Sequence, residues 1–266
     1  MEILKNTCYT EVTTKCKSKA EFQVPETLNP ELKSNARKLI FEKAPKLFIV
    51  SAIFVVIVTA ITELQFRLPG TISAYSQYME LIALGTPHAA GVFLSFIKPA
   101  GAALAAVLMI LGGVVRVGLM SYCLKTSRGR PADLIDIFKG FQYLLKVSII
   151  LIVTALLVAG WSILFLFPGI AAFYRYRQAF YILLDDPRKS PLQCVRESKL
   201  MMHGRKLDLF LLDLSFVGWF AISVTLSLVM LLSFPFTIPI VSVWLSPYAG
   251  LSRAAFYDRL LDNLAV

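Results

Sequence analysis

The chain has 266 residues, of which 57% are hydrophobic and 17% are charged, and its formal net charge is +10. Because a soluble domain carries about 25% charged residues, this composition and its long apolar runs argue against a soluble enzyme and predict an all-α integral membrane protein. The basic surplus suits cytoplasmic loops that face anionic inner-leaflet lipids, so we expect lipid contacts and no nucleic-acid partner.

Residues 1–45 predict a polar cytoplasmic N-terminal tail. The first apolar run begins only at about residue 46, so we expect no signal peptide. Within the tail, residues 29–46 predict a helix that lies on the membrane surface. Asn29 can cap this helix, and Pro30 suits its first position.

The rest of the chain, residues 46–262, predicts one membrane domain with six transmembrane helices. Their expected ranges are about 47–64, 99–124, 147–167, 168–184, 207–232 and 239–260. The Tyr-containing stretch 71–98 predicts interfacial helices on the outer side. The second span is rich in glycine and alanine, which let helix backbones approach closely.

The segment 125–146 predicts a basic loop followed by an amphipathic interfacial helix. Four apolar residues fall on one face of that helix: Leu134, Phe138, Phe141 and Leu145. The SRGRP turn at its start resembles a phosphate-binding loop only loosely, and we interpret it as a basic interfacial turn.

The break at Pro168-Gly169 allows either a kink within one long helix or a hairpin into a fourth span. The distribution of Lys and Arg decides between these outcomes. Residues 125–146 hold five and residues 185–206 hold six, whereas residues 65–88 hold one. Since basic segments stay inside, the chain must cross the membrane twice between the first two segments. Pro168-Gly169 is then the expected outer turn, and both termini are cytoplasmic.

Residues 190–204 predict a cytoplasmic helix. Ser190 and Gln193 form a capping box, Pro191 suits the first helical position, and Gly204 can end the helix. Residues 234–240 predict the outer turn before the last span, which we expect to bend near Pro247.

Five ionisable residues within the predicted spans form a candidate site: Arg116, Arg175, Arg177, Asp213 and Arg253. At 1.5 Å per residue, four of them lie about 9–12 Å from the cytoplasmic end of their spans, and Arg175 lies a little deeper. Our hypothesis is a polar layer in which Asp213 pairs with one or more of the arginines and the surplus guanidiniums can receive an anion such as a lipid phosphate. The alternative is that these arginines only snorkel to the headgroups or pair for structural reasons.

The sequence offers no clear catalytic or metal-binding set. Asp185-Asp186-Pro187 is typical of a helix end and turn, and His88 and His203 are expected on opposite sides of the membrane. The four cysteines, Cys8, Cys16, Cys123 and Cys194, have no metal-binding spacing. We therefore expect no enzyme activity, no metal and no cofactor.

Several short motifs follow one another from Phe167 onward: Pro168-Gly169-Ile170, Asp186-Pro187, SKLMMHGRKLDLF, LSFVGW and SPYAGLSRAAFY. In these motifs the sequence resembles a bacterial integral membrane family, domain of unknown function 975. The stretch SLVMLLSFPFTIPIVSVW departs from that family, which tends to have a short Gly-rich turn there. The resemblance implies a six-span membrane protein and no activity, because the family has no established catalytic set.

Together these patterns predict a non-catalytic, multi-pass protein of the cell membrane. It would interact with lipid or serve as a partner subunit, with another membrane protein or a second copy of itself. A small transporter or export factor that uses the Arg/Asp layer stays open, although we find no inverted repeat. A membrane enzyme that acts on lipid headgroups would need a His or carboxylate cluster that this sequence lacks.

Overall fold

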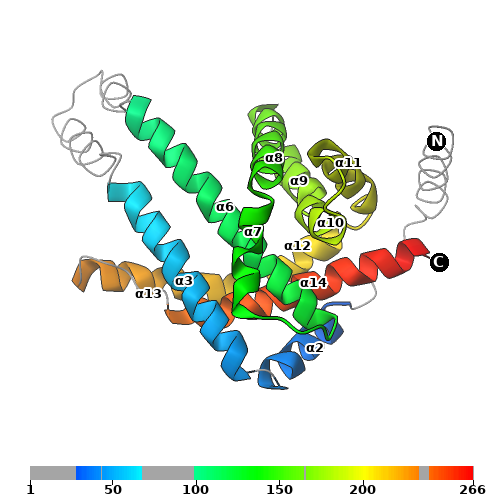
Figure 1. Ribbon diagram of the computed structural model, residues 1–266, viewed down its shortest axis with the longest axis horizontal. Coiled ribbons are helices and arrows are strands. Elements are labelled where there is room, and N and C mark those ends of the chain that lie inside the picture. The colour runs from blue at the N-terminus through cyan, green and yellow to red at the C-terminus, as the bar shows by residue number, and fades with distance from the viewer. Residues whose placement is uncertain (1–27, 43, 68–98, 165, 234–239, 266) are drawn as a thin grey trace.

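A computed structural model describes residues 28–42, 44–67, 99–164, 166–233 and 240–265 (Figure 1). Within these ranges the chain forms helices joined by turns, with no strand, so the all-α prediction is confirmed. The predictions for the first part of the tail, for the stretch 71–98 and for the turn at 234–239 lie outside the described residues.

Twelve helices lie within the described residues. In order they are α2 (Leu28–Glu42), α3 (Ala44–Arg67), α6 (Pro99–Ser127), the 3-10 helix η1 (Leu134–Phe138), α7 (Lys139–Gln142), α8 (Leu144–Leu164), α9 (Leu166–Tyr176), α10 (Ala179–Asp185), α11 (Pro191–Met201), α12 (Lys206–Leu214), α13 (Val217–Ser233) and α14 (Ile240–Ala265).

Three helices of the described residues are long and apolar enough to cross a membrane: Pro45–Gln65 in α3, Ala103–Ser127 in α6 and Leu144–Ile163 in α8. A fourth crossing results if the bent pair Lys206–Leu214 and Val217–Ser227 forms one span. By length and composition these helices indicate a membrane protein. The six crossings expected from the sequence stay a prediction.

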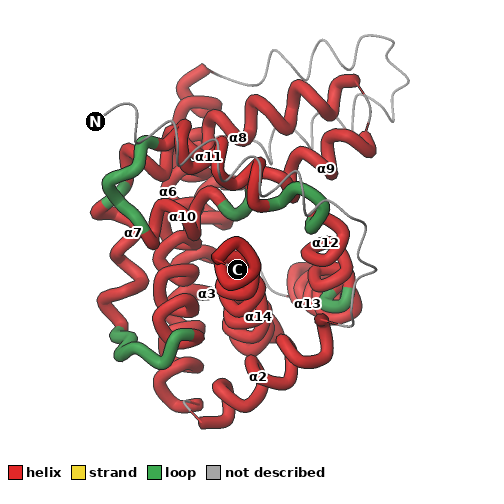
Figure 2. The backbone as a smooth tube through the Cα atoms, turned by 90° about the vertical axis from the view of Figure 1, so that its right-hand side faces the viewer, coloured by secondary structure: helices red, strands yellow, loops and turns green. Residues whose placement is uncertain are grey.

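Helix α14 lies at the centre of the fold. Figure 2 views it nearly along its axis, with α3 and α6 on one side, α12 and α13 on the other, and α2 beneath. Its side chains Leu245, Phe256 and Tyr257 are almost fully buried. Pro247 lies within this helix. The α14 segment therefore packs against protein over much of its length, where its serines and Arg253 can find protein partners.

Helices α8 and α9 form a hairpin and lie side by side (Figure 1). The chain therefore reverses as expected, but Pro168-Gly169 is not the turn, because both residues lie inside α9. Proline is tolerated in a first helical turn, where its missing N–H has no acceptor. Gly169 allows the close helix contact, since a Cβ there would lie 2.1 Å from Ser162 Oγ.

Two of the predicted spans are broken in the structure. The segment 168–184 forms α9 and α10, which are separated by Arg177 and Gln178. The segment 207–232 forms α12 and α13, which meet at an angle of 45°. Helix α9 has 11 residues and is about 16 Å long, too short to cross a hydrocarbon core of about 30 Å by itself.

Helix α6 meets η1 and α7 backbone to backbone. A Cβ on Gly118 of α6 would lie 1.6 Å from the Ile137 carbonyl oxygen, and a Cβ on Gly140 of α7 would lie 2.1 Å from the Val114 carbonyl oxygen. The expected amphipathic helix in 125–146 is therefore split into η1, α7 and the start of α8. The backbones of η1 and α7 lie so close to the backbone of α6 that only glycine fits at these two contact points.

Helix α11 forms as the sequence predicts. Ser190 accepts a hydrogen bond from the Gln193 backbone N–H and completes the capping box, with Pro191 at the first helical position. Gly204 has a positive φ of 79° shortly after the helix end, a backbone conformation that glycine adopts at little cost. The N-terminal helix α2 also forms, and it packs on α14.

Candidate functional site

Asp213 on α12 is the centre of an ion-pair cluster that joins three parts of the chain. Arg177, directly after α9, donates from Nη1 to Asp213 Oδ2. Arg253 on α14 donates from Nε to Asp213 Oδ1 at 2.9 Å. The Arg177 guanidinium also lies over the rings of Phe173 and Tyr174, at 5.3 and 5.8 Å from their centres. Both oxygens of the carboxylate are thus occupied.

The other two residues of the predicted layer do not reach Asp213. Arg116 is exposed on α6, and no described side chain pairs with it. Arg175 is half-buried on α9, where its carbonyl oxygen accepts a hydrogen bond from Ser198 Oγ at 2.9 Å. Two arginines and one carboxylate therefore form the cluster. Its geometry stabilises the contact of α9, α12 and α14.

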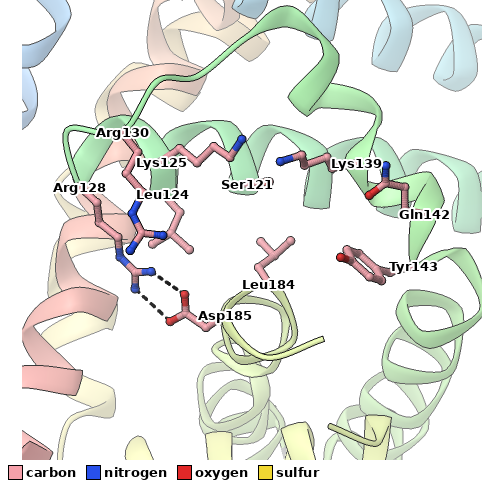
Figure 3. A pocket seen from close by; sticks show the side chains of 10 residues that line it. All are labelled: Ser121, Leu124, Lys125, Arg128, Arg130, Lys139, Gln142, Tyr143, Leu184 and Asp185. Carbon is pink, nitrogen blue, oxygen red and sulfur yellow. Dashed lines mark hydrogen bonds and ion pairs between the residues drawn. The ribbon is translucent and has the colours of Figure 1, made fainter. Parts of the chain in front are cut away.

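A pocket of about 160 Å³ lies between the end of α6, α7 and the end of α10 (Figure 3). Four basic side chains line it: Lys125, Arg128, Arg130 and Lys139. The rest of its lining is mixed: Leu124, Leu184, Ser121, Gln142, Tyr143 and Asp185. In Figure 3 the amino groups of Lys125 and Lys139 extend toward each other along one edge, and the Tyr143 hydroxyl points toward the space between them and Leu184. This site is termed the basic pocket.

Arg128 ties the end of α6 to two other helices. Its guanidinium donates to Asp185 at the end of α10, with Nη2–Oδ2 at 2.9 Å, and to Asp258 on α14, with Nε–Oδ1 at 2.8 Å. Tyr257 of α14 donates its hydroxyl to the same Asp185 carboxylate at 2.9 Å. The hydrogen bond to Asp185 is the main cause that raises the pKa of Arg128, against the lowering effect of burial. This fork holds one wall of the pocket in place.

Asp136 of η1 holds the opposite pair of cations. Its carboxylate lies 2.8 Å from Lys125 Nζ and 2.9 Å from Lys139 Nζ. The Asp133 backbone N–H also donates to it at 3.0 Å. Burial alone would raise the pKa of Asp136. The hydrogen bonds from Lys125, Asp133 and Lys139 together lower it by more than burial raises it, so the pKa falls below its ordinary value. The carboxylate is therefore ionised at neutral pH.

Four donors that line the basic pocket have no hydrogen-bond partner within the described part of the chain. They are the Ser121 hydroxyl, the Arg130 guanidinium, the Gln142 amide and the Tyr143 hydroxyl. Ser121 is only 7% exposed, whereas Arg130 and Gln142 are exposed at the edge of the pocket. The pocket therefore presents donors to a group that can accept hydrogen bonds.

A band of exposed apolar side chains lies on η1, α7 and the start of α8, the segment that contributes to the pocket. Its members are Leu134, Ile135, Phe138, Phe141 and Leu145. Four of these residues are the ones that the sequence places on one face, and their side chains point away from the core. Such a patch is uncommon on a soluble monomer and is typical of a surface that enters the headgroup region. We refer to it as the apolar band.

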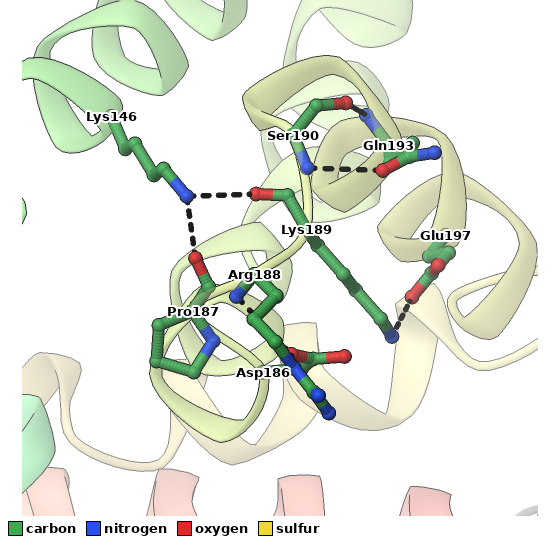
Figure 4. A network of polar contacts seen from close by, with 8 residues as sticks. All are labelled: Lys146, Asp186, Pro187, Arg188, Lys189, Ser190, Gln193 and Glu197. Atoms are coloured by element: carbon green, nitrogen blue, oxygen red, sulfur yellow. Dashed lines mark hydrogen bonds and ion pairs between the residues drawn. The ribbon is translucent and has the colours of Figure 1, made fainter.

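The loop between α10 and α11 is fixed to the start of α8 (Figure 4). Lys146 Nζ donates to the carbonyl oxygens of Pro187 and Lys189, and Lys189 Nζ lies 2.7 Å from a Glu197 carboxylate oxygen. The backbone N–H of Arg188 is the main cause that lowers the pKa of Asp186. Asp185 and Asp186 therefore serve as a helix end and turn, as the sequence indicates, and Asp185 also binds Arg128.

Within the described residues, no group of three or more His, Cys, Asp or Glu side chains is arranged to hold a metal ion. Cys123 and Cys194 are free and buried. Burial raises the pKa of Cys194 to about 11, so its thiol is protonated at neutral pH.

Residues 144–263 match the model of a family described as "Protein of unknown function (DUF975)". The match covers 120 of the 266 residues, and we refer to this C-terminal part as the DUF975 region. The resemblance to domain of unknown function 975 is thereby confirmed over α8 to α14. No curated protein and no solved structure matches the chain.

The DUF975 region supplies all three members of the Asp213 cluster but only part of the basic pocket. Leu184 and Asp185 come from this region, whereas the other lining residues precede it. Sequence reasoning missed the pocket because Arg128 meets its partners Asp185 and Asp258 at separations of 57 and 130 residues. The SRGRP turn was the available signal, since it holds Arg128 and Arg130.

Proposed function

We propose that the protein is a non-catalytic, multi-pass protein of the cell membrane that binds anionic lipid at its cytoplasmic face. The observation that carries this proposal is the basic pocket with the apolar band on the same short segment. A lipid needs both features at one place, because its headgroup is charged and its chains are apolar.

The energetic case rests on two moderate contributions. Moving a large apolar side chain out of water stabilises by about 1.5–3 kcal/mol when burial is complete, so each partly covered member of the apolar band contributes roughly 1 kcal/mol. Each Lys or Arg near an anionic bilayer surface adds about 1 kcal/mol. The η1–α7 segment would therefore rest firmly at the inner interface.

The proposed topology has six crossings with both termini in the cytoplasm. Its support is the placement of basic residues in 125–146 and 185–206. These two segments also meet at the basic pocket, where Arg128 pairs with Asp185. Because both segments are basic, the inner side suits them. In a background in which the four native cysteines are replaced by serine, an Arg188→Cys variant should react with an impermeant thiol reagent only after the cells are opened, whereas Thr86→Cys should react in intact cells. Labelling of Arg188→Cys in intact cells would overturn this orientation.

Lipid binding is tested by purifying the protein in mild detergent and identifying the retained lipids by mass spectrometry. We expect anionic phospholipids to be enriched several-fold over their share in the source membrane. A retained set with the same composition as the membrane would refute the proposal.

A second candidate is a small transporter, favoured by the 45° bend between α12 and α13 two residues after Asp213. A broken helix beside a charge cluster is a feature of several transporter folds. Proteoliposomes loaded with a pH-sensitive dye test this candidate. A proton or anion flux that Asp213→Asn abolishes would support transport, and equal flux with and without the wild-type protein would exclude these substrates.

A further inference from the structure

The polar side chains of the basic pocket fall into two groups: cations that carboxylates of the chain bind, and donors that have no partner among the described residues. The carboxylates of Asp136 and Asp185 hold Lys125, Lys139 and Arg128 in the walls. The hydroxyls of Ser121 and Tyr143, the Gln142 amide and the Arg130 guanidinium stay available. A group that fills this pocket should therefore be rich in hydrogen-bond acceptors and carry negative charge.

The charge balance restricts which anion fits. Four cations line the pocket. Three of them, Lys125, Lys139 and Arg128, are bound by the three carboxylates of Asp136, Asp185 and Asp258, and Arg130 is bound by none of these. One positive charge is left over. A phosphodiester carries one negative charge, whereas a phosphomonoester carries about −1.5 to −2 at pH 7. The diester is therefore the better match.

The size of the pocket agrees with a phosphate group. A cavity of about 150 Å³ binds benzene, which has six non-hydrogen atoms, and a phosphate has five. The basic pocket has about 160 Å³ and is smaller than the roughly 300–1,000 Å³ of sites for drug-sized molecules. The phosphate would fill it, and the rest of the headgroup would lie at its mouth.

We propose that the basic pocket binds the phosphodiester of a glycerophospholipid whose headgroup is otherwise uncharged. Arg130, Ser121 and Tyr143 donate to the phosphate oxygens, and the acyl chains lie along the apolar band. An ammonium headgroup is disfavoured, because its positive charge would lie close to Lys125 and Lys139. This inference rests on the proposed lipid-binding function and names the lipid and its site.

The test equilibrates the delipidated full-length protein with equal amounts of phosphatidylglycerol, phosphatidylcholine and phosphatidic acid, and it counts bound lipids by native mass spectrometry. Wild-type protein should prefer phosphatidylglycerol over phosphatidylcholine by at least about tenfold, and phosphatidic acid should bind no more tightly than phosphatidylglycerol. The double variant Arg130→Gln/Tyr143→Phe should lose at least about tenfold in phosphatidylglycerol binding, because it removes two hydrogen bonds to a charged group.

A matched control removes one guanidinium and one phenol hydroxyl elsewhere. Arg188, whose side chain is 94% exposed, and Tyr176 on α9 both lie outside the pocket. The double variant Arg188→Gln/Tyr176→Phe should bind phosphatidylglycerol within about twofold of wild type. A tenfold loss in this control as well would mean that the effect is not local, and the pocket assignment would fail.

The outcomes separate the site from the function. If wild-type protein shows no preference for anionic lipid, both the lipid-binding function and this site are wrong. A preference that survives in Arg130→Gln/Tyr143→Phe refutes the pocket alone. Tighter binding of phosphatidic acid by wild-type protein refutes the diester assignment without any variant. Water-soluble glycerophosphoglycerol should compete weakly, and competition at concentrations equal to those of the lipid would identify a soluble diester as the ligand.

Discussion

The substitution Gly118→Ala tests the close contact between α6 and η1 that supports the basic pocket. The added Cβ would lie 1.6 Å from the Ile137 carbonyl oxygen, and ordinary contact begins at 3.4 Å. The two backbones must therefore separate by about 1.8 Å at this point. The obstacle is a backbone oxygen, so a rotamer change cannot relieve it.

This separation also breaks a specific hydrogen bond. Lys125 on α6 lies 2.8 Å from Asp136 on η1, so a shift of that size would take the pair well beyond hydrogen-bonding distance. A lost hydrogen bond to a charged group costs about 1.5–3 kcal/mol, and overpacking costs about 1–3 kcal/mol. The gain from alanine in a helix offsets about 1 kcal/mol. The net loss in the free energy of unfolding is then about 1.5–5 kcal/mol.

Thermal unfolding of the purified protein in detergent measures this effect. With about 2–4 °C per kcal/mol for a chain of this size, Gly118→Ala should lower the midpoint by roughly 3–20 °C. Gly112→Ala on the same helix is the control, since its Cβ would lie 3.8 Å from Ile61 Cγ2, an ordinary contact. The control should unfold at or slightly above the wild-type temperature. Equal midpoints for the two variants would refute the backbone contact of α6 and η1.

Three further predictions concern the charged groups. Replacing Arg128 with Lys removes the two-helix fork and should destabilise the protein by about 1–3 kcal/mol, whereas the exposed Arg188→Lys should have no measurable effect in the same thermal assay. Asp213→Asn leaves two guanidiniums facing each other and should lower protein yield and unfolding temperature more than Asp208→Asn. The Asp208 side chain is about as exposed as that of Asp213, but it pairs with one arginine, Arg205, three residues before it. Equal effects of the two substitutions would contradict the cluster. Because the pKa of Asp136 lies below its ordinary value of 3.8, its stabilisation of η1 is fully present above about pH 4 and is lost as the pH falls through the lowered value. The protection factors of the 134–142 amides, which correct the exchange rates for the intrinsic effect of pH, should therefore fall at pH 3 but stay constant between pH 5 and 7.

Helix identity and local caps could be predicted because they depend on nearby residues. The apolar runs of α3, α6 and α8 and the capping box at Ser190 are examples. The breaks between α9 and α10 and between α12 and α13 escaped prediction, since each interrupts a run that has the length of a span. A run of apolar residues shows only that the segment is apolar on average. It does not reveal at which residue the helix breaks, because the break lies beside a tertiary ion pair such as Arg177 with Asp213.

The candidate sites differ in the same way. The Asp213 cluster could be anticipated because few charges occur in the predicted spans, where an isolated carboxylate needs a cation as its partner. Which arginines pair with it depends on tertiary packing, so Arg116 and Arg175 were grouped with it although they lie elsewhere. The basic pocket could not be assembled from sequence at all, because its walls come from α6, α7 and α10 and their contacts depend on two glycines.

The charged groups of the Asp213 cluster serve the contact between helices, whereas the basic pocket also holds donors that a ligand can use. At Asp213 every oxygen of the carboxylate is bound by an arginine of the chain, so the charges there serve the contact between helices. At the basic pocket, Arg128 is bound by Asp185 and Asp258, which belong to the DUF975 region, whereas Arg128 itself precedes that region. The end of α6 is therefore fixed to the DUF975 helices by an ion pair, and the neighbouring Arg130 and Tyr143 keep their donors free. A ligand for this protein is best sought where fixed charges surround donors that the fold itself leaves unused.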